Sequence, residues 1–144
     1  MAVKSTKGKL YRRGSGSSLI ETVMGSILIV MIALFLVDVA AVVVCQTQND
    51  ALAKHIARSA ANQVNYATGD SARLDVVNEF KANNKSNICT YKTSTLGADA
   101  GWTQVVARSE VFCVFPVPIP FGPSQMVFAA EATEPVVGTV PPAP

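Results

Sequence analysis

The chain has 144 residues, of which 49% are hydrophobic and only 15% charged, and its formal net charge is +2. This length allows at most one domain of ordinary size, and the apolar content excludes a chain that is disordered throughout. With 9 Gly and 8 Pro, the sequence is neither collagen-like nor a low-complexity fibre.

The first 16 residues are basic, and the segment that follows them is apolar. Residues 1–16 hold five of the twelve Lys and Arg residues and no acid, whereas residues 22–37 carry no charge at all. The apolar run resumes after Asp38 and ends at Cys45. A helix from Leu19 to Cys45 is about 40 Å long, and a bilayer core of about 30 Å needs roughly 20 apolar residues. We therefore expect a single transmembrane segment over residues 17–45, with the basic N-terminus on the cytoplasmic side.

A cleaved secretory signal is the alternative interpretation of this segment. Its apolar core would have 7–15 residues and a small-residue cleavage site after it. Here the apolar part is about twice that length, and no convincing A-x-A cleavage site follows it. A lipoprotein signal ending at Cys45 is also disfavoured, because Val44 is bulky where a small residue is expected.

The helix is expected to continue beyond the membrane. Residues 46–68 are rich in Ala and contain no Pro or Gly. Seven residues recur at a spacing of three and four and indicate one packed face of an exported amphipathic half: Ala51, Leu52, His55, Ile56, Ser59, Ala60 and Gln63. The sequence thus predicts one long helix over residues 17–67, apolar all round in its first half and amphipathic in its second.

A small head is predicted for residues 69–134. Gly69, Asp70 and Ser71 are residues that end one helix and begin the next, which favours a short second helix over 71–83 and a loop over 83–87. The composition then shifts to β-formers over residues 87–93, 102–108, 110–121 and 125–132, with a turn-rich connector over 94–101. The expected fold class is α+β, with a small antiparallel sheet beside the helices.

Prolines limit the last part of this head. Pro116, Pro118 and Pro120 cannot donate to a ladder, so the strand over 110–121 must end at an edge or leave the sheet there. Before them, Val111 and Cys113 alternate with Phe112 and Val114. The tail over residues 135–144, with three Pro in its last four positions, is predicted to be flexible.

The junction between the basic and apolar segments carries a short motif. Gly16 is followed by four uncharged residues and then by Glu21, directly before the apolar run. This arrangement resembles the processing site of type IV prepilins. The resemblance implies that a prepilin peptidase cuts between Gly16 and Ser17 and that Ser17 becomes the first residue of the processed chain. A carboxylate at the edge of a hydrocarbon segment is costly, so Glu21 is best tolerated beside a cation such as the free amine of Ser17 in a neighbouring subunit.

A more specific resemblance covers most of residues 12–137. The order is the basic leader (residues 1–16), the Gly-to-Glu junction, one membrane helix, an RSAA stretch, a Val-rich strand with a Pro-Phe hairpin (VFCVFPVPIPFGPS), and a closing strand of the form MVFAAEATEPV. This pattern is similar to the TadE-like family, the minor pseudopilins of tight-adherence (Tad) pilus systems. It implies a non-catalytic subunit for assembly of a pilus or secretion filament. Its implied partners are the prepilin peptidase, other pilin or pseudopilin subunits, membrane lipid, and an inner-membrane platform with its motor ATPase.

An alternative function remains open at this point. The chain could be a single-pass membrane protein with an uncleaved anchor and an exported domain that binds a ligand or partner. Both interpretations place the chain in the bacterial inner membrane with its head exported, and the pilin interpretation adds incorporation into an extracellular pilus.

Three cysteines are present, which is an odd count. Cys45 lies in the apolar helix and is interpreted as a small hydrophobic residue. Cys89 and Cys113 fall in predicted strands of the exported part, where disulfides persist. A bridge between them closes a loop of about 25 residues and stabilises the fold by roughly 3–4 kcal/mol in the chain-entropy model. We therefore hypothesise a Cys89–Cys113 disulfide.

The remaining reactive residues give little sign of catalysis. Asp38 lies seventeen residues past Glu21 and is interpreted either as an interfacial acid at the outer membrane boundary or as one that faces a partner helix. With His55 as the one histidine, a metal site or a Ser-His-Asp triad is not expected, and no nucleotide-binding loop occurs. Nucleic-acid binding is not expected, because residues 46–144 carry 7 basic and 8 acidic side chains. We expect no enzyme activity, catalytic residue, cofactor or metal.

Overall fold

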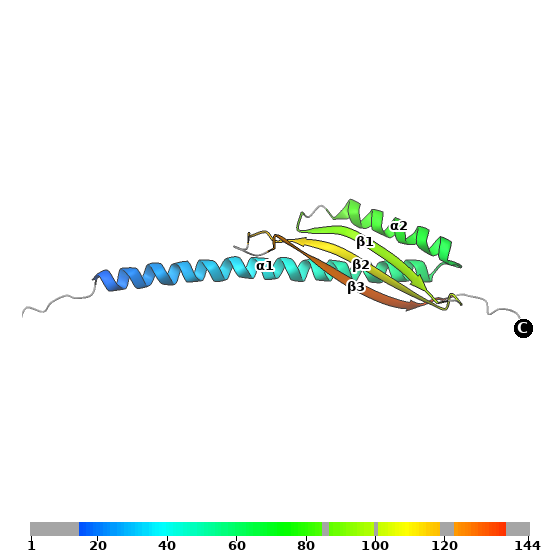
Figure 1. Ribbon diagram of the computed structural model, residues 1–144, viewed down its shortest axis with the longest axis horizontal. Coiled ribbons are helices and arrows are strands. Elements are labelled where there is room, and N and C mark those ends of the chain that lie inside the picture. Colours follow the sequence, from blue (N-terminus) through cyan, green and yellow to red (C-terminus); the bar gives the residue numbers. More distant parts are fainter. Residues whose placement is uncertain (1–14, 85–86, 100, 119–122, 138–144) are drawn as a thin grey trace, which may run out of the picture. The chain divides into compact units, whose positions relative to one another are not determined.

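The computed structural model describes residues 15–84, 87–99, 101–118 and 123–137. The fold class is α+β, as predicted. Its elements in chain order are α1 (Ser15–Ala61), α2 (Tyr66–Asn83), β1 (Cys89–Ala98), β2 (Gln104–Val114) and β3 (Gln125–Pro135) (Figure 1). The chain divides into two compact units, residues 1–35 and residues 36–144. The second unit holds the sheet, α2 and the C-terminal part of α1, and is called the head below.

The three strands form one antiparallel sheet in the order β1-β2-β3. β2 is the central strand and buries every second side chain, including Val105, Ser109 and Cys113. The alternation predicted for its second half is confirmed. Segments predicted as two strands, over 102–108 and 110–121, form this single strand because Ser109 continues the alternation. β2 ends at Val114, ahead of the prolines, as the missing proline donors require.

β1 extends further than the sequence predicted. The connector predicted for 94–101 is wrong in its first half, because β1 continues to Ala98. A register shift lies between Tyr91 and Thr93. This bulge leaves Tyr91 and Ser94 on the same face, where the Tyr91 hydroxyl and Ser94 Oγ are 2.9 Å apart. Leu96, which is buried, then packs in the core and holds the strand in place.

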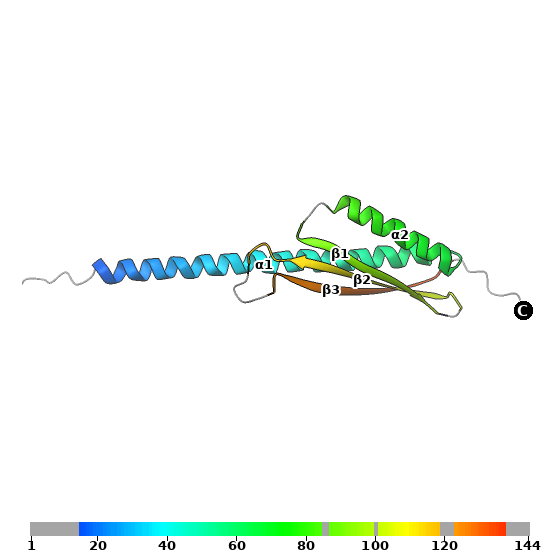
Figure 2. The same ribbon diagram turned by 45° about the horizontal axis from the view of Figure 1, so that its top comes forward.

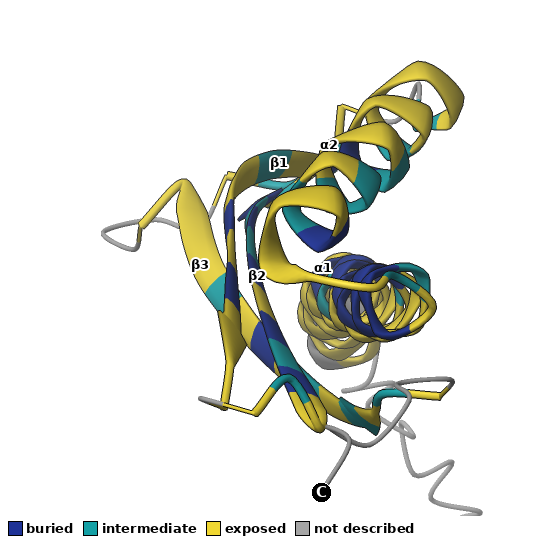
Figure 3. Cartoon of the chain, turned by 90° about the vertical axis from the view of Figure 1, so that its right-hand side faces the viewer, coloured by how far each residue is buried: buried dark blue, intermediate teal, exposed yellow. Residues whose placement is uncertain are grey.

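Both helices cover the same face of the sheet (Figures 2 and 3). In the head, the core joins Leu52, Ile56 and Ala60 of α1 to Val105 and Ala107 of β2. The face predicted for α1 is correct for those three α1 residues. It is wrong at two other positions.

Ala51 and His55 are exposed, because the buried stripe of α1 is rotated away from them. The residues of that stripe are Asp38, Ala41, Cys45, Asn49, Leu52, Ala53, Ile56, Ala57, Ala60 and Ala61. The stripe therefore begins well inside the segment assigned to the membrane.

The break between the helices lies earlier than predicted. α1 ends at Ala61 rather than at 67, and α2 begins at Tyr66 rather than at 71. Asn65 caps α2, because its side chain accepts the Thr68 N–H at 3.0 Å. The indole N–H of Trp102 donates to the carbonyl of Gln63 at 2.8 Å and so satisfies an acceptor at the corner.

Gly69 is inside α2 and does not end a helix. A Cβ at this position would lie 2.8 Å from the Trp102 ring. The glycine is therefore needed for the close approach of Trp102.

The tail predicted from residue 135 is partly structured. Pro135 belongs to β3, and the backbone N–H of Val136 donates to Thr103 O at 2.9 Å. The N–H of Val137 donates to Ala61 O at 3.4 Å. Residues 138–144, most of the predicted leader (1–14), and Pro120 lie outside the described residues.

Candidate functional site

The first part of α1 presents an uninterrupted apolar surface. All residues from 18 to 37 are exposed, and most of them are Ile, Leu, Val, Met or Phe. Residues 19–37 of a helix span about 28 Å at 1.5 Å per residue, close to the thickness of a bilayer core. By length and composition, α1 is able to cross a membrane.

The residues of the Gly16-to-Glu21 junction lie at the start of this surface. α1 begins at Ser15, so the backbone of Gly16 and Ser17 is in its first turn. Glu21 is exposed and, within the described ranges of the chain, forms no ion pair. The hydroxyls of Thr22 and Ser26 each donate to the carbonyl four residues earlier, at 2.8 Å. Glu21 is thus the one acid between residues 18 and 37, and its side chain lies on an otherwise uncharged surface.

Asp38 occupies the first position of the buried stripe. Its side chain faces the head, where Oδ1 accepts the backbone N–H of Val117 at 3.1 Å, and only 6% of the residue is exposed. Val117 lies between Pro116 and Pro118, which have no N–H, so it carries the donor of that stretch. The interpretation of Asp38 as an acid facing a partner helix is therefore wrong. The carboxylate joins α1 to the loop after β2 of its own chain.

The three cysteines gather in one small apolar cluster with Val111. Cys89 and Cys113 face each other in the β1–β2 register. Since the Val114 N–H donates to Ile88 O at 2.8 Å, they form a non-hydrogen-bonded pair, whose Cα atoms are about 4.5 Å apart in antiparallel sheets. That separation is within the range of disulfides.

The hypothesised Cys89–Cys113 bridge is nevertheless not present, and all three cysteines are free and buried. The Cys113 thiol has a backbone neighbour in Ala41 O at 3.7 Å, and the Cys45 thiol has one in Ile88 O at 3.4 Å. Burial raises the pKa of the Cys89 thiol, which disfavours the thiolate needed for disulfide formation. The cysteines act here as small core residues.

A buried polar group fixes α1 on the sheet. Asn49 Nδ2 donates to Phe128 O of β3 at 3.0 Å, and Ser109 Oγ of β2 donates to Asn49 Oδ1 at 2.7 Å. Asn49 and Ser109 are at most 1% exposed. Because a buried amide without partners is costly, this pair specifies one register of the helix against the sheet. Sequence reasoning missed both residues, although Asn49 is four residues after Cys45 and Ser109 continues the alternation of β2.

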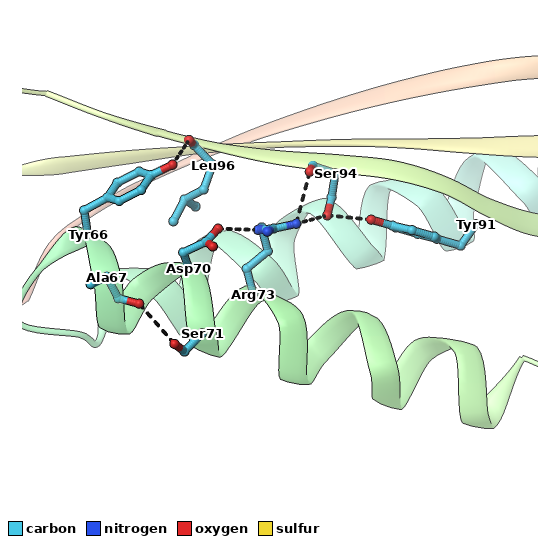
Figure 4. Close-up of polar contacts among 8 residues, drawn as sticks. All are labelled: Tyr66, Ala67, Asp70, Ser71, Arg73, Tyr91, Ser94 and Leu96. Carbon is cyan, nitrogen blue, oxygen red and sulfur yellow. Dashed lines mark hydrogen bonds and ion pairs between the residues drawn. The ribbon is translucent and has the colours of Figure 1, made fainter.

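A second polar group fixes α2 on β1 (Figure 4). Arg73 donates from Nε to Asp70 Oδ1 at 2.7 Å and from Nη1 to Ser94 Oγ at 2.9 Å. The Asp70 carboxylate raises the pKa of Arg73 further above its ordinary value. Tyr66 Oη donates to Leu96 O at 3.2 Å one turn earlier in α2. Asp70, expected as a helix cap, is therefore part of the contact between α2 and the sheet.

A groove of about 370 Å³ lies between α1 and α2. Leu52, Val76 and Phe80 contribute apolar walls, and His55 and Glu79 contribute polar ones. Gln48 also lines it, and its buried Oε1 has no hydrogen-bond partner in the described part of the chain. Among the described residues, no group of three or more His, Cys, Asp or Glu side chains is placed to hold a metal ion.

No protein-family model, no curated protein and no solved structure matches this chain.

Proposed function

We propose that this chain is a non-catalytic, pilin-like subunit, a TadE-like minor pseudopilin that takes part in assembly of a Tad or type IV-like pilus or secretion filament. The observation that carries the proposal is the surface of α1. Its residues 19–37 are exposed on every side and follow a prepilin-type junction, while the same helix is packed against a head from Asp38 onward. A helix of this design suits a subunit that waits in a membrane and later packs against copies of itself.

In this function the chemistry is performed on the chain. The prepilin peptidase cuts between Gly16 and Ser17 and frees the α-amino group of Ser17. Glu21 then accepts that cation from a neighbouring subunit, which offsets the cost of a carboxylate at the edge of an apolar environment. The basic leader keeps the N-terminus cytoplasmic, so the head is exported from the inner membrane. The assembly platform and its motor ATPase complete the set of partners.

A second function is favoured by a different observation. In a membrane-anchored binding protein the leader stays attached, and the groove between α1 and α2 binds the ligand. The apolar walls of Leu52 and Phe80 supply a contact surface for it, and the exposed side chains of His55 and Glu79 supply polar partners.

The mass of the intact protein distinguishes the two functions. The chain is purified from membranes with and without an active prepilin peptidase. Under the pilin function, the mass with the peptidase corresponds to a chain that starts at Ser17, and Gly16→Ala retains the leader. Gly25→Ala is the matched control and is processed normally, because it changes a glycine of the same helix where an added Cβ would have nothing within 4 Å. A native chain that starts at Met1 in the presence of the active peptidase contradicts the pilin function.

A further inference from the structure

The end of the β2–β3 hairpin is uncharged and apolar. Residues 111–130 contain no Asp, Glu, Lys or Arg. β2 and β3 stay paired to Val114 and Gln125, and the Phe115 N–H donates to Ser124 O at 3.1 Å beyond that pair. Val114, Met126 and Val127 are between 36% and 46% exposed. We call the described apolar residues of this region the hairpin end: Val114, Phe115, Val117, Met126 and Val127.

The hydrogen bond of Asp38 sets the level of the hairpin end along α1. Asp38 directly follows the exposed apolar residues 19–37 and accepts the N–H of Val117. The hairpin end is therefore held at the level of α1 where the helix stops being exposed on every side, although Val39, Val43 and Val44 remain exposed beyond it. Since Asp38 is only 6% exposed as a residue, it presents little charge at this level.

The charged groups of the sheet lie further along the strands. Lys92 and Glu110 form an ion pair at 2.9 Å, and Arg108 lies 3.5 Å from Glu110. Glu110 is four residues before Val114, which is about 13 Å along a strand. Glu110 and Arg108 thus lie away from the apolar end, which is held at the level of Asp38, while the Lys92 ammonium reaches toward it and lies 5.6 Å from the centre of the Phe112 ring.

We infer that the hairpin end rests on the lipid surface of the bilayer that α1 crosses, with its apolar side chains at the boundary between headgroups and acyl chains. Exposed apolar patches mark interaction sites, and apolar side chains beside a membrane anchor are stabilised by burial at this boundary. The inference depends on α1 spanning a bilayer, which both functions proposed above share. It does not depend on processing at Gly16.

Tryptophan quenching by brominated lipid tests this contact. The full chain, carrying Trp102→Phe to remove its one tryptophan, is placed in phosphatidylcholine vesicles with bromine on the acyl chains. Val127→Trp reports on the hairpin end, and Thr133→Trp, exposed on the same strand six residues further on, is the matched control. Leu28→Trp reports on the middle of the apolar segment. We expect quenching several-fold stronger at position 127 than at 133, and strongest at 28.

Quenching at the three positions distinguishes a failure of the lipid contact from a failure of the membrane span. Strong quenching at 28 with equal quenching at 127 and 133 overturns the lipid contact and leaves the membrane helix intact. Absence of quenching at 28 overturns the membrane span, and the contact with it.

The unmodified chain provides a measurement that is independent of folding defects in the variants. Amide exchange of residues 114–118 and 123–127 is expected to be slower in vesicles than in lipid-free amphipol, whereas that of residues 130–137 is unchanged. Equal protection of the hairpin end in vesicles and in amphipol overturns the lipid contact.

Discussion

The two parts of α1 differ in the size of the side chains that face a neighbour. Residues 19–37 display large aliphatic and aromatic side chains, whereas six of the ten buried residues from Asp38 to Ala61 are Ala or Cys. Small residues let a helix approach a sheet closely, and the sheet supplies larger partners such as Val105 and Val111. The size of the side chains therefore separates the part that packs on its own head from the part that stays exposed.

The two parts of α1 also differ in where their polar side chains find hydrogen-bond partners. In the head-bound part, Asp38 and Asn49 have partners on the sheet or its loops. In the exposed part, the hydroxyl of Thr22 bonds to its own helix, and Glu21 forms no ion pair among the described residues. A polar residue in the apolar helix is thus satisfied by the sheet or its loops only where the head covers it.

The largest expected effect comes from truncating one isoleucine in each part. Ile56→Ala removes a side chain that is 0% exposed in the core, and we expect the free energy of unfolding to fall by about 2–5 kcal/mol. Ile27→Ala, at a position that is 51% exposed, is the matched control and leaves the stability of the head unchanged. Denaturant unfolding of the full chain in detergent micelles, followed by Trp102 fluorescence, measures both. Equal losses for the two variants would show that the apolar half also packs on the head.

Several features of the fold could be predicted from sequence because their signals are local. Hydrophobic periodicity indicated two helices, although not the break between them, and the alternation around Val111 and Cys113 located the inner face of β2. The prolines after Phe115 located the end of that strand. The Gly16–Glu21 junction is likewise a local pattern, so it could be found without a structure.

Other features could not be predicted, because their partners are distant in sequence. The amide that bonds to Asp38 is 79 residues away, and the indole that bonds to Gln63 O is 39 residues away. Gly69 has the local signature of a helix end, but the ring of Trp102 needs its missing side chain within α2. Cys89 and Cys113 are adjacent as expected, yet adjacency alone does not decide whether two buried thiols are oxidised.

Replacing a helical glycine by alanine compares the head with the exposed part of α1 again, and the expected change in the free energy of unfolding is smaller. At Gly69 a Cβ would meet the Trp102 ring at 2.8 Å, while at Gly25 it would meet nothing within 4 Å. Alanine gains about 1 kcal/mol of helix propensity at either site, and overpacking costs about 1–3 kcal/mol at the first. We expect Gly69→Ala to lower the free energy of unfolding by about 1 kcal/mol and to shift the Trp102 emission. Gly25→Ala should do neither, and a stabilised Gly69→Ala would show that the indole moves freely.

The smallest expected effect is the pH dependence of the outer sheet surface, where Lys92 donates to Glu110 Oε2 at 2.9 Å. This hydrogen bond, with the charges of Lys92 and Arg108, lowers the pKa of Glu110 below its ordinary value of 4.5. The pKa of Glu110 is therefore lower in the folded chain than in the unfolded chain. The stabilisation from its ion pair with Lys92 is complete above pH 4.5 and is lost as the pH falls through the pKa of the folded state.

The free energy of unfolding is expected to decline in acid, partly because this ion pair is lost. Glu110→Gln and Lys92→Met should both make that decline smaller. Lys54→Met serves as the control, since Lys54 is exposed on α1 and forms no ion pair within the described ranges. An unchanged acid decline in both Glu110→Gln and Lys92→Met would exclude the pair as its source. Because Glu110 lies four residues before Val114 on β2, loss of this ion pair should leave the lipid contact of the hairpin end intact.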